Sequence, residues 1–259
     1  MKLKCFFSIT FILFPVLIHA EIKTEVVQYK HAGATLKSFM TYDDSIKEKR
    51  PGILIAPEWW GLNDYPKNRA KQLTELGYVV LAIDIYGEGK ITQDPKEAGQ
   101  LSGFYKNDRS LLRGRVLAGL NALKNSKKVN SSQVAAIGYC FGGTSVLELA
   151  RSGADVKGVV SFHGGLDTPQ LADAKNIKAK VLVLHGADDN FVPQDQILAF
   201  QKEMKDAQVN WQMNYYSNAV HTFTNPNADE YKIPGVAYNK QADERSWKAM
   251  LQFFDEIFK

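Results

Sequence analysis

Gly138-Tyr139-Cys140-Phe141-Gly142-Gly143 is the stretch of this 259-residue chain from which its fold can be inferred. The apolar residues 134–137 before it predict a buried strand of a parallel sheet, and residues 144–150 after it predict a helix. Glycines two positions before and two positions after Cys140 leave room for a sharp turn between the two elements. Strand, turn and helix in this order form a nucleophile elbow, usually written G-x-S-x-G, with Cys in place of Ser. The alternative is a buried, inert cysteine at a glycine-rich turn.

Buried strands alternate with helices on both sides of this turn. Apolar runs predict further strands at residues 52–56, 78–83, 156–162, 181–185 and 210–216. Apolar residues at helical spacing predict helices at 66–76, 112–123, 193–204 and 244–258, the second of them preceded by a polar loop. Residues 26–29 and 34–41 predict a hairpin. The pattern indicates an α/β fold with a mostly parallel central sheet, helices on both faces and an N-terminal antiparallel hairpin. Ligands of such sheets bind at the carboxyl ends of the strands, where Cys140 lies.

The first twenty residues are set apart from the rest of the chain. Lys2 and Lys4 precede an apolar run from 5 to 18, and Ala20 offers a small residue before a cleavage point. This layout predicts a signal peptide at 1–20, cleaved near Ala20, and a periplasmic or secreted domain at 21–259. The run is shorter than a membrane span and contains Pro15, so we expect no stable membrane insertion after cleavage. An uncleaved anchor is the alternative.

Charge and cysteine content bound the function of the mature chain. Loss of two lysines changes the formal charge from +4 to 30 minus 28, or +2, which gives no reason to expect a nucleic-acid partner. Loss of Cys5 leaves Cys140 as the only thiol, and a lone cysteine in an exported protein is either reactive or buried and inert. The sequence has no His-x-x-x-His or paired-cysteine spacing, so we expect no metal. We also expect no cofactor and a monomer.

A thiol nucleophile needs a base to take its proton and an acid to orient that base. His221 follows the strand at 210–216 across a short turn and is the candidate base. Asp188 and Asp189 both follow a core strand; Asp189 fits the spacing G-x-x-D-x-x-V-P, and Asp188 fits a turn or capping role. The chain order nucleophile, acid, histidine is that of α/β-hydrolases. His163 also ends a strand and is a candidate substrate contact in the cleft.

These residues resemble the dienelactone hydrolase family, and the resemblance runs from Gly52 to the final helix. Four motifs carry it: the cysteine elbow at 138–143, Asp189 followed by Phe191-Val192-Pro193, the late His221-Thr222-Phe223, and Pro57-Glu58-Trp59-Trp60-Gly61 after the first core strand. The combination is specific, although no single motif is. The resemblance implies an α/β-hydrolase fold and a carboxymethylenebutenolidase-like ester hydrolase.

The resemblance also implies roles for residues that the pattern alone does not assign. In the family, the glutamate matching Glu58 lies beside the resting thiol and takes part in forming the thiolate. The backbone N–H groups of Trp59 and Phe141 would form the oxyanion hole, where each donor contributes a few kcal/mol. From their place on loops after core strands, Trp59, Trp60 and Tyr86 are candidates for an aromatic wall around the substrate, with packing in the core or at the surface as the alternative.

The thiol limits which type of ester can be cleaved, but it does not identify the substrate. Thiolate leaves a tetrahedral intermediate more readily than a simple alkoxide, so activated esters or enol lactones fit better than alkyl esters. The loops after Tyr86 and His221 lack the arginines that hold the carboxylate of dienelactone in the family, so the substrate stays open. Two other readings remain: a binding protein on a hydrolase fold, and a thiol-based redox or stress protein, which the absence of a resolving cysteine disfavours.

Overall fold

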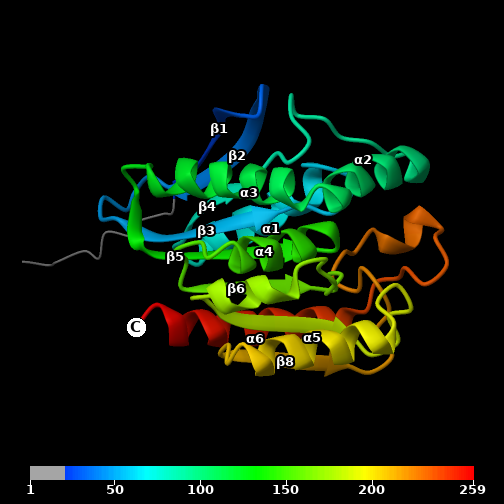
Figure 1. Cartoon of the computed structure of the whole chain (residues 1–259). Coiled ribbons are helices and arrows are strands. Elements are labelled where there is room, and N and C mark those ends of the chain that lie inside the picture. The colour runs from blue at the N-terminus through cyan, green and yellow to red at the C-terminus, as the bar shows by residue number, and fades with distance from the viewer. Residues whose placement is uncertain (1–20) are drawn as a thin grey trace, which may run out of the picture.

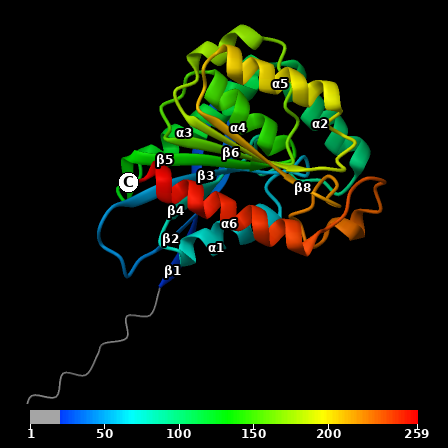
Figure 2. The same cartoon turned by 90° about the horizontal axis from the view of Figure 1, so that it is seen from below.

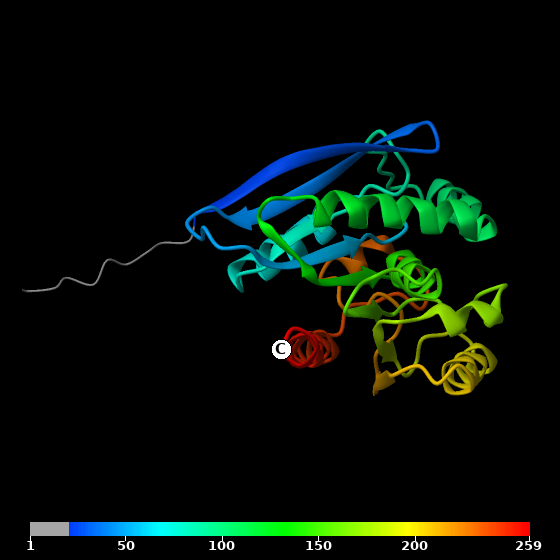
Figure 3. The same cartoon turned by 60° about the vertical axis from the view of Figure 1, so that its left-hand side comes forward.

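The computed structural model describes residues 21–259, so the predicted signal segment at 1–20 lies outside the described part. Eight strands form one sheet in the order β1-β2-β4-β3-β5-β6-β7-β8. The strands are β1 (Ile22–His31), β2 (Ala34–Asp43), β3 (Arg50–Ala56), β4 (Val79–Ala82), β5 (Val129–Tyr139), β6 (Gly158–Phe162), β7 (Lys180–Gly186) and β8 (Trp211–Tyr216). Every pair from β4 to β8 is parallel, whereas β1 pairs antiparallel with β2 and β2 with β4. The predicted sheet and hairpin are confirmed, and Figure 3 shows the hairpin at one edge.

Helices cover both faces of the sheet (Figure 1). They are α1 (Asp64–Glu75), α2 (Pro95–Asn107), α3 (Arg109–Lys124), α4 (Phe141–Arg151), α5 (Gln194–Asp206) and α6 (Lys240–Ile257), with short 3-10 helices η1 (Leu171–Asn176) and η2 (Ala228–Tyr231). Figure 2 shows α1 and α6 on one face and α2 to α5 on the other. The parallel strands are thus buried on both sides, as their unbroken apolar sequences require.

Alternate residues of the strands feed two separate cores. In β3, Leu54 and Ala56 face the cluster under α3, α4 and α5, while Ile53 and Ile55 face the cluster under α1 and α6. All four side chains are fully buried. This alternation follows from the two-residue period of a strand. The parallel pairing of β3, β5, β6 and β7 brings their carboxyl ends to one edge of the sheet.

One predicted element was wrong. The segment before the third helix was interpreted as a polar loop, but residues Pro95–Asn107 form α2. The side chain of Asp94 accepts a hydrogen bond from the N–H of Lys96, and Pro95 occupies the first turn, which are strong start signals. The helix was missed because only three of its thirteen side chains, Ala98, Ser102 and Tyr105, are buried.

Helix starts also differ from the sequence prediction. Helices α1 and α6 begin two and four residues earlier than predicted, because Asn63 and Asn239 cap them through their side chains. Within residues 21–259, none of the helices has the length and apolar character needed to cross a membrane.

Candidate active site

Cys140 lies at the turn between β5 and α4, where the backbone is strained. Its φ of 53° and ψ of −115° are unusual for a residue with a side chain. The neighbouring glycines are needed for close approach: a Cβ on Gly138 would overlap the carbonyl of Gly142, and a Cβ on Gly142 would overlap the carbonyl of Ala56. The elbow therefore packs directly on the end of β3, which places the thiol beside the loop that carries Glu58.

Three loops bring a histidine and a carboxylate to this thiol. His221 Nε2 lies 3.1 Å from Cys140 Sγ, and His221 Nδ1 lies 2.8 Å from Asp189 Oδ2. The other carboxylate oxygen of Asp189 accepts the backbone N–H of Phe191 at 2.9 Å, which fixes its orientation. Asp188 is exposed, so the structure pairs Asp189 and not Asp188 with the histidine.

The groups around His221 favour the protonated form of its ring. Burial opposes a charged ring, but the negative charge of the Cys140 sulfur and the hydrogen bond to Asp189 outweigh it and raise the pKa of His221 to about 10. Cys140 is itself the N-cap residue of α4, whose positive end favours a thiolate. With this raised pKa, the His221 ring that faces the Cys140 sulfur is protonated at neutral pH.

Glu58 is buried beneath the same edge of the sheet. Its Oε2 accepts a hydrogen bond from Asn225 Nδ2 at 2.9 Å, while its Oε1 is buried without a partner among the described residues. Burial raises the pKa of Glu58 to about 7, although the hydrogen bond from Asn225 lowers it. In this structure the thiol is directed to His221 and the carboxylate to Asn225, and the two share no hydrogen bond. Asn225 was not singled out in the sequence, although it follows His221 by four positions in the loop that lacks arginine.

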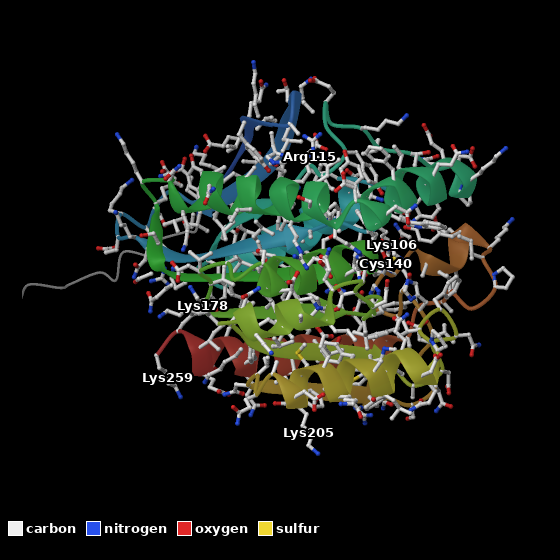
Figure 4. All side chains as sticks on the ribbon, in the orientation of Figure 1. Lys106, Arg115, Cys140, Lys178, Lys205 and Lys259 are labelled. Carbon is white, nitrogen blue, oxygen red and sulfur yellow. The ribbon has the colours of Figure 1, made fainter. Side chains whose placement is uncertain are left out.

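The thiol opens into a cavity of about 240 Å³. Among the predicted residues, those that line it are Trp59, Trp60, Cys140, Phe141 and His221. The sequence did not reveal the wall residues Ser102 and Lys106 from α2, or Tyr231, Ile233 and Val236 from the segment after the histidine. Figure 4 labels Lys106 and Cys140, and both line this one cavity. Most of the wall is aromatic or aliphatic, with one ammonium group from Lys106.

Two backbone donors face this region without an acceptor. No hydrogen bond of the described residues uses the N–H of Trp59 or of Phe141. Phe141 is the first residue of α4, so its N–H has no partner within that helix. Both residues line the cavity together with Cys140, so their N–H groups are the candidate donors of an oxyanion hole.

Two residues predicted as substrate contacts, Tyr86 and His163, do not line this cavity. Tyr86 stands behind the wall: its hydroxyl donates to the carbonyl of Trp59 at 2.8 Å, and its ring stacks on Phe141 with centroids 6.0 Å apart. His163 is fully buried and does not line the cavity. A residue at a strand end can point beneath the cleft as readily as into it, and these two side chains do not line the cavity.

Comparison with known proteins agrees with this geometry. The family model described as the dienelactone hydrolase family matches residues 37–258. The chain belongs to the dienelactone hydrolase family. It is therefore an α/β-hydrolase, a hydrolase of ester or lactone bonds.

Relatives within and near the dienelactone hydrolase family cover nearly the whole chain. A crystal structure of a dienelactone hydrolase-like promiscuous phosphotriesterase from metagenomic libraries is 40% identical, covers 93% of this chain and 100% of its own, and superposes with a TM-score of 0.89. Protein usf of Aquifex pyrophilus is 26% identical over 240 residues, covering 90% of this chain and 98% of its own. A protein of Aquifex aeolicus named provisionally as a carboxymethylenebutenolidase is 26% identical over 243 residues, covering 91% of this chain and 99% of its own.

Proposed function

We propose that this protein hydrolyses an activated ester or enol lactone through an acyl-enzyme on Cys140. The observation that carries the proposal is the continuous chain from Sγ through the His221 ring to Asp189, with contacts of 3.1 and 2.8 Å, beside the cavity that Cys140 and His221 line. A nucleophile, a base and an orienting acid in hydrogen-bond contact are the elements of covalent acyl transfer.

The proposed reaction has two halves. The thiolate attacks the carbonyl carbon and forms a C–S bond, and the resulting oxyanion accepts hydrogen bonds from the N–H groups of Trp59 and Phe141. The C–O bond then breaks, and His221 Nε2 gives its proton to the leaving oxygen. In the second half, His221 takes a proton from water, the hydroxide attacks the thioester, and the acid product leaves as the Cys140 thiolate forms again.

Glu58 is proposed to assist in making the thiolate. Its pKa of about 7 leaves a large fraction of the carboxylate ionised at neutral pH, and its Oε1 has no hydrogen-bond partner among the described residues. When Cys140 is a neutral thiol turned away from His221, a buried carboxylate of this kind can accept its proton, and the proton returns to the sulfur after the product has left. This role is the one that the matching glutamate has in the family. The burial of Glu58 and the missing hydrogen-bond partner of its Oε1 support it.

The cavity supports a small substrate with an activated leaving group. A volume of about 240 Å³ accommodates a short acyl group or a single lactone ring rather than a long lipid chain. Because thiolate is a better leaving group than alkoxide, aryl and enol esters should be cleaved much faster than alkyl acetates. Equal rates on ethyl acetate and phenyl acetate would contradict this part of the proposal.

Phosphotriesters are a second candidate substrate class. The observation that favours them is the 40% identity, over nearly the whole chain, to the promiscuous phosphotriesterase structure. Attack of Cys140 on phosphorus would form a P–S bond and release an aryloxide, using the same histidine. Release of p-nitrophenol from ethyl paraoxon by the native chain, and its loss in Cys140→Ala, would support this activity.

We also propose that the protein is exported and acts as a monomer. The composition of residues 1–20 supports export. Expression of the full chain in a Gram-negative host should give a periplasmic protein whose intact mass begins at Glu21, and sedimentation should give a single species near the mass of the mature chain. A cytoplasmic, full-length product would contradict the first point, and a dimer the second.

Acyl-enzyme formation provides the central test. The native chain, Cys140→Ala and Cys140→Ser are incubated with p-nitrophenyl acetate, and intact mass is followed with the release of p-nitrophenol. We expect the native chain to gain one acetyl group and turn over, Cys140→Ala to do neither, and Cys140→Ser to keep the fold with greatly reduced turnover. Turnover that survives in Cys140→Ala would refute the nucleophile assignment, and no acylation of the native chain would favour a binding protein.

A further inference from the structure

His163 contacts the nucleophile through the backbone. The N–H of Cys140 lies 3.1 Å from His163 Nδ1 and 3.0 Å from the carbonyl oxygen of Phe162, so the two acceptors share it. A backbone N–H can only donate, so Nδ1 must carry a lone pair and the ring proton must sit on Nε2. The hydrogen-bond partner therefore fixes the tautomer of His163.

The other ring nitrogen is tied down as well. His163 Nε2 lies 2.7 Å from Thr224 Oγ1, and that hydroxyl lies 2.6 Å from the hydroxyl of Tyr65. Arg69 donates to the carbonyl of Thr224 at 2.6 Å and forms an ion pair with Asp243. The ring is thus the end of a buried polar chain that joins α1, α6 and the loop of His221 to the turn of Cys140.

His163 is held neutral by its surroundings. Burial and then the positive charge of His221 keep the pKa of His163 well below its usual value. The edge-to-face contact between the two rings, with centroids 5.4 Å apart, would place two like charges together if both were protonated. A neutral His163 leaves His221 as the one imidazolium of the pair.

We infer that His163 is a positioning residue that sets the direction of the Cys140 thiol through the nucleophile's backbone N–H. The inference rests on the proposed function of Cys140. At φ of 53° the peptide of Cys140 is strained, and two acceptors hold its N–H in place. Loss of the Nδ1 acceptor lets this peptide rotate, which shifts both Sγ and the adjacent N–H of Phe141. Small displacements of this kind reduce rates by about 10²-fold.

Two amide variants separate the two ring bonds. His163→Asn places an acceptor oxygen near the position of Nδ1 but cannot reach Thr224. His163→Gln can reach Thr224 with its amide but leaves the Cys140 N–H without the second acceptor. A role in positioning predicts that Asn retains function and Gln does not, whereas a role only in packing predicts losses that follow stability.

The readouts are the acylation burst with p-nitrophenyl acetate, the alkylation rate of Cys140 by iodoacetamide, and urea unfolding. We expect His163→Asn to keep acylation within about threefold of the native chain and His163→Gln to lose about 30- to 100-fold, in line with small displacements at a reacting centre. Alkylation should separate the two variants in the same order. Equal losses in both variants, or a larger loss in Asn, would overturn the inference.

The design separates failure of this inference from failure of the proposed function. If the native chain does not turn over esters, the function fails, and alkylation of Cys140 still compares the two variants. If neither variant folds, the ring ¹⁵N chemical shifts of His163 in the native chain test the inference, because they show which ring nitrogen carries the proton. A proton on Nε2 and none on Nδ1 from pH 5 to 9 is the expected result, and a proton on Nδ1 would overturn the inference.

Discussion

Glu58→Gln should remove part of the pH dependence of the free energy of unfolding of this protein. The native carboxyl is fully buried, with one oxygen bonded to Asn225 and the other without a partner among the described residues. Glutamine has the same shape and keeps an oxygen for Asn225, but it cannot ionise. The comparison therefore isolates what it costs the folded state to bury the ionised form of this group.

The magnitude follows from the pKa. Burial raises the pKa of Glu58 from 4.5 to about 7, so between these values the folded protein binds more protons than the unfolded chain. Stability from this group is therefore highest below pH 4.5 and falls as pH rises through 7. The full loss is about 3 kcal/mol, of which about 2.5 kcal/mol falls between pH 5 and pH 8.5. The variant lacks this loss, and its unpaired amide adds only a constant cost at every pH.

Urea unfolding followed by tryptophan fluorescence at pH 5 and pH 8.5 measures both proteins. We expect the free energy of unfolding of Glu58→Gln to gain about 2.5 kcal/mol on that of the native chain between the two pH values. Glu48→Gln, at an exposed position, controls for the removal of one negative charge. Parallel pH dependence in the native chain and Glu58→Gln would refute the reasoning, since Glu58 would then titrate as a solvated carboxylate.

Three other substitutions test separate features. Asp189→Asn should lower the turnover number about 10²- to 10⁴-fold in steady-state assays with unchanged unfolding, because His221 loses its orienting charge; less than tenfold would contradict the assigned role. Gly142→Ala should destabilise by more than about 2 kcal/mol in urea, since its Cβ overlaps a backbone carbonyl, whereas Gly103→Ala, with open space, should be neutral or stabilising. Lys106→Ala should raise KM for 4-acetoxybenzoate about threefold, because the carboxylate of this substrate loses the ammonium group, and should leave KM for phenyl acetate unchanged. At high salt the increase in KM for 4-acetoxybenzoate should disappear.

The fold was predictable wherever burial is continuous. Parallel strands buried on both faces leave an apolar run that has few other interpretations, and all of the predicted core strands are present. Helix α2 was not predictable in this way, because its few buried side chains leave no long apolar stripe. Its capping signal at Asp94-Pro95 was present in the sequence, and local capping is the information that periodicity omits.

The site was predictable where the chemistry requires a particular residue type at a particular strand end. Cys140, Asp189 and His221 belong to this class, and the structure brings them into contact. Tyr86 and His163 follow strands in the same way, but their side chains lie beneath the cavity. A strand end fixes where a Cα lies; the direction of a loop side chain depends on tertiary partners that no local pattern encodes.

The cavity walls and the reacting groups come from different parts of the fold, and this division has a consequence for specificity. The thiol and the carboxylate follow buried parallel strands, which hold them rigidly, whereas Lys106 and Tyr231 come from α2 and η2, outside the sheet. Substitutions in α2 and η2 can therefore change the size and charge of the cavity without moving the nucleophile. For a small probe such as p-nitrophenyl acetate, which needs little of the wall, such substitutions should leave the acylation rate near the native value. Larger acyl groups should be affected because they reach these walls, and so should a leaving group whose carboxylate faces the Lys106 ammonium.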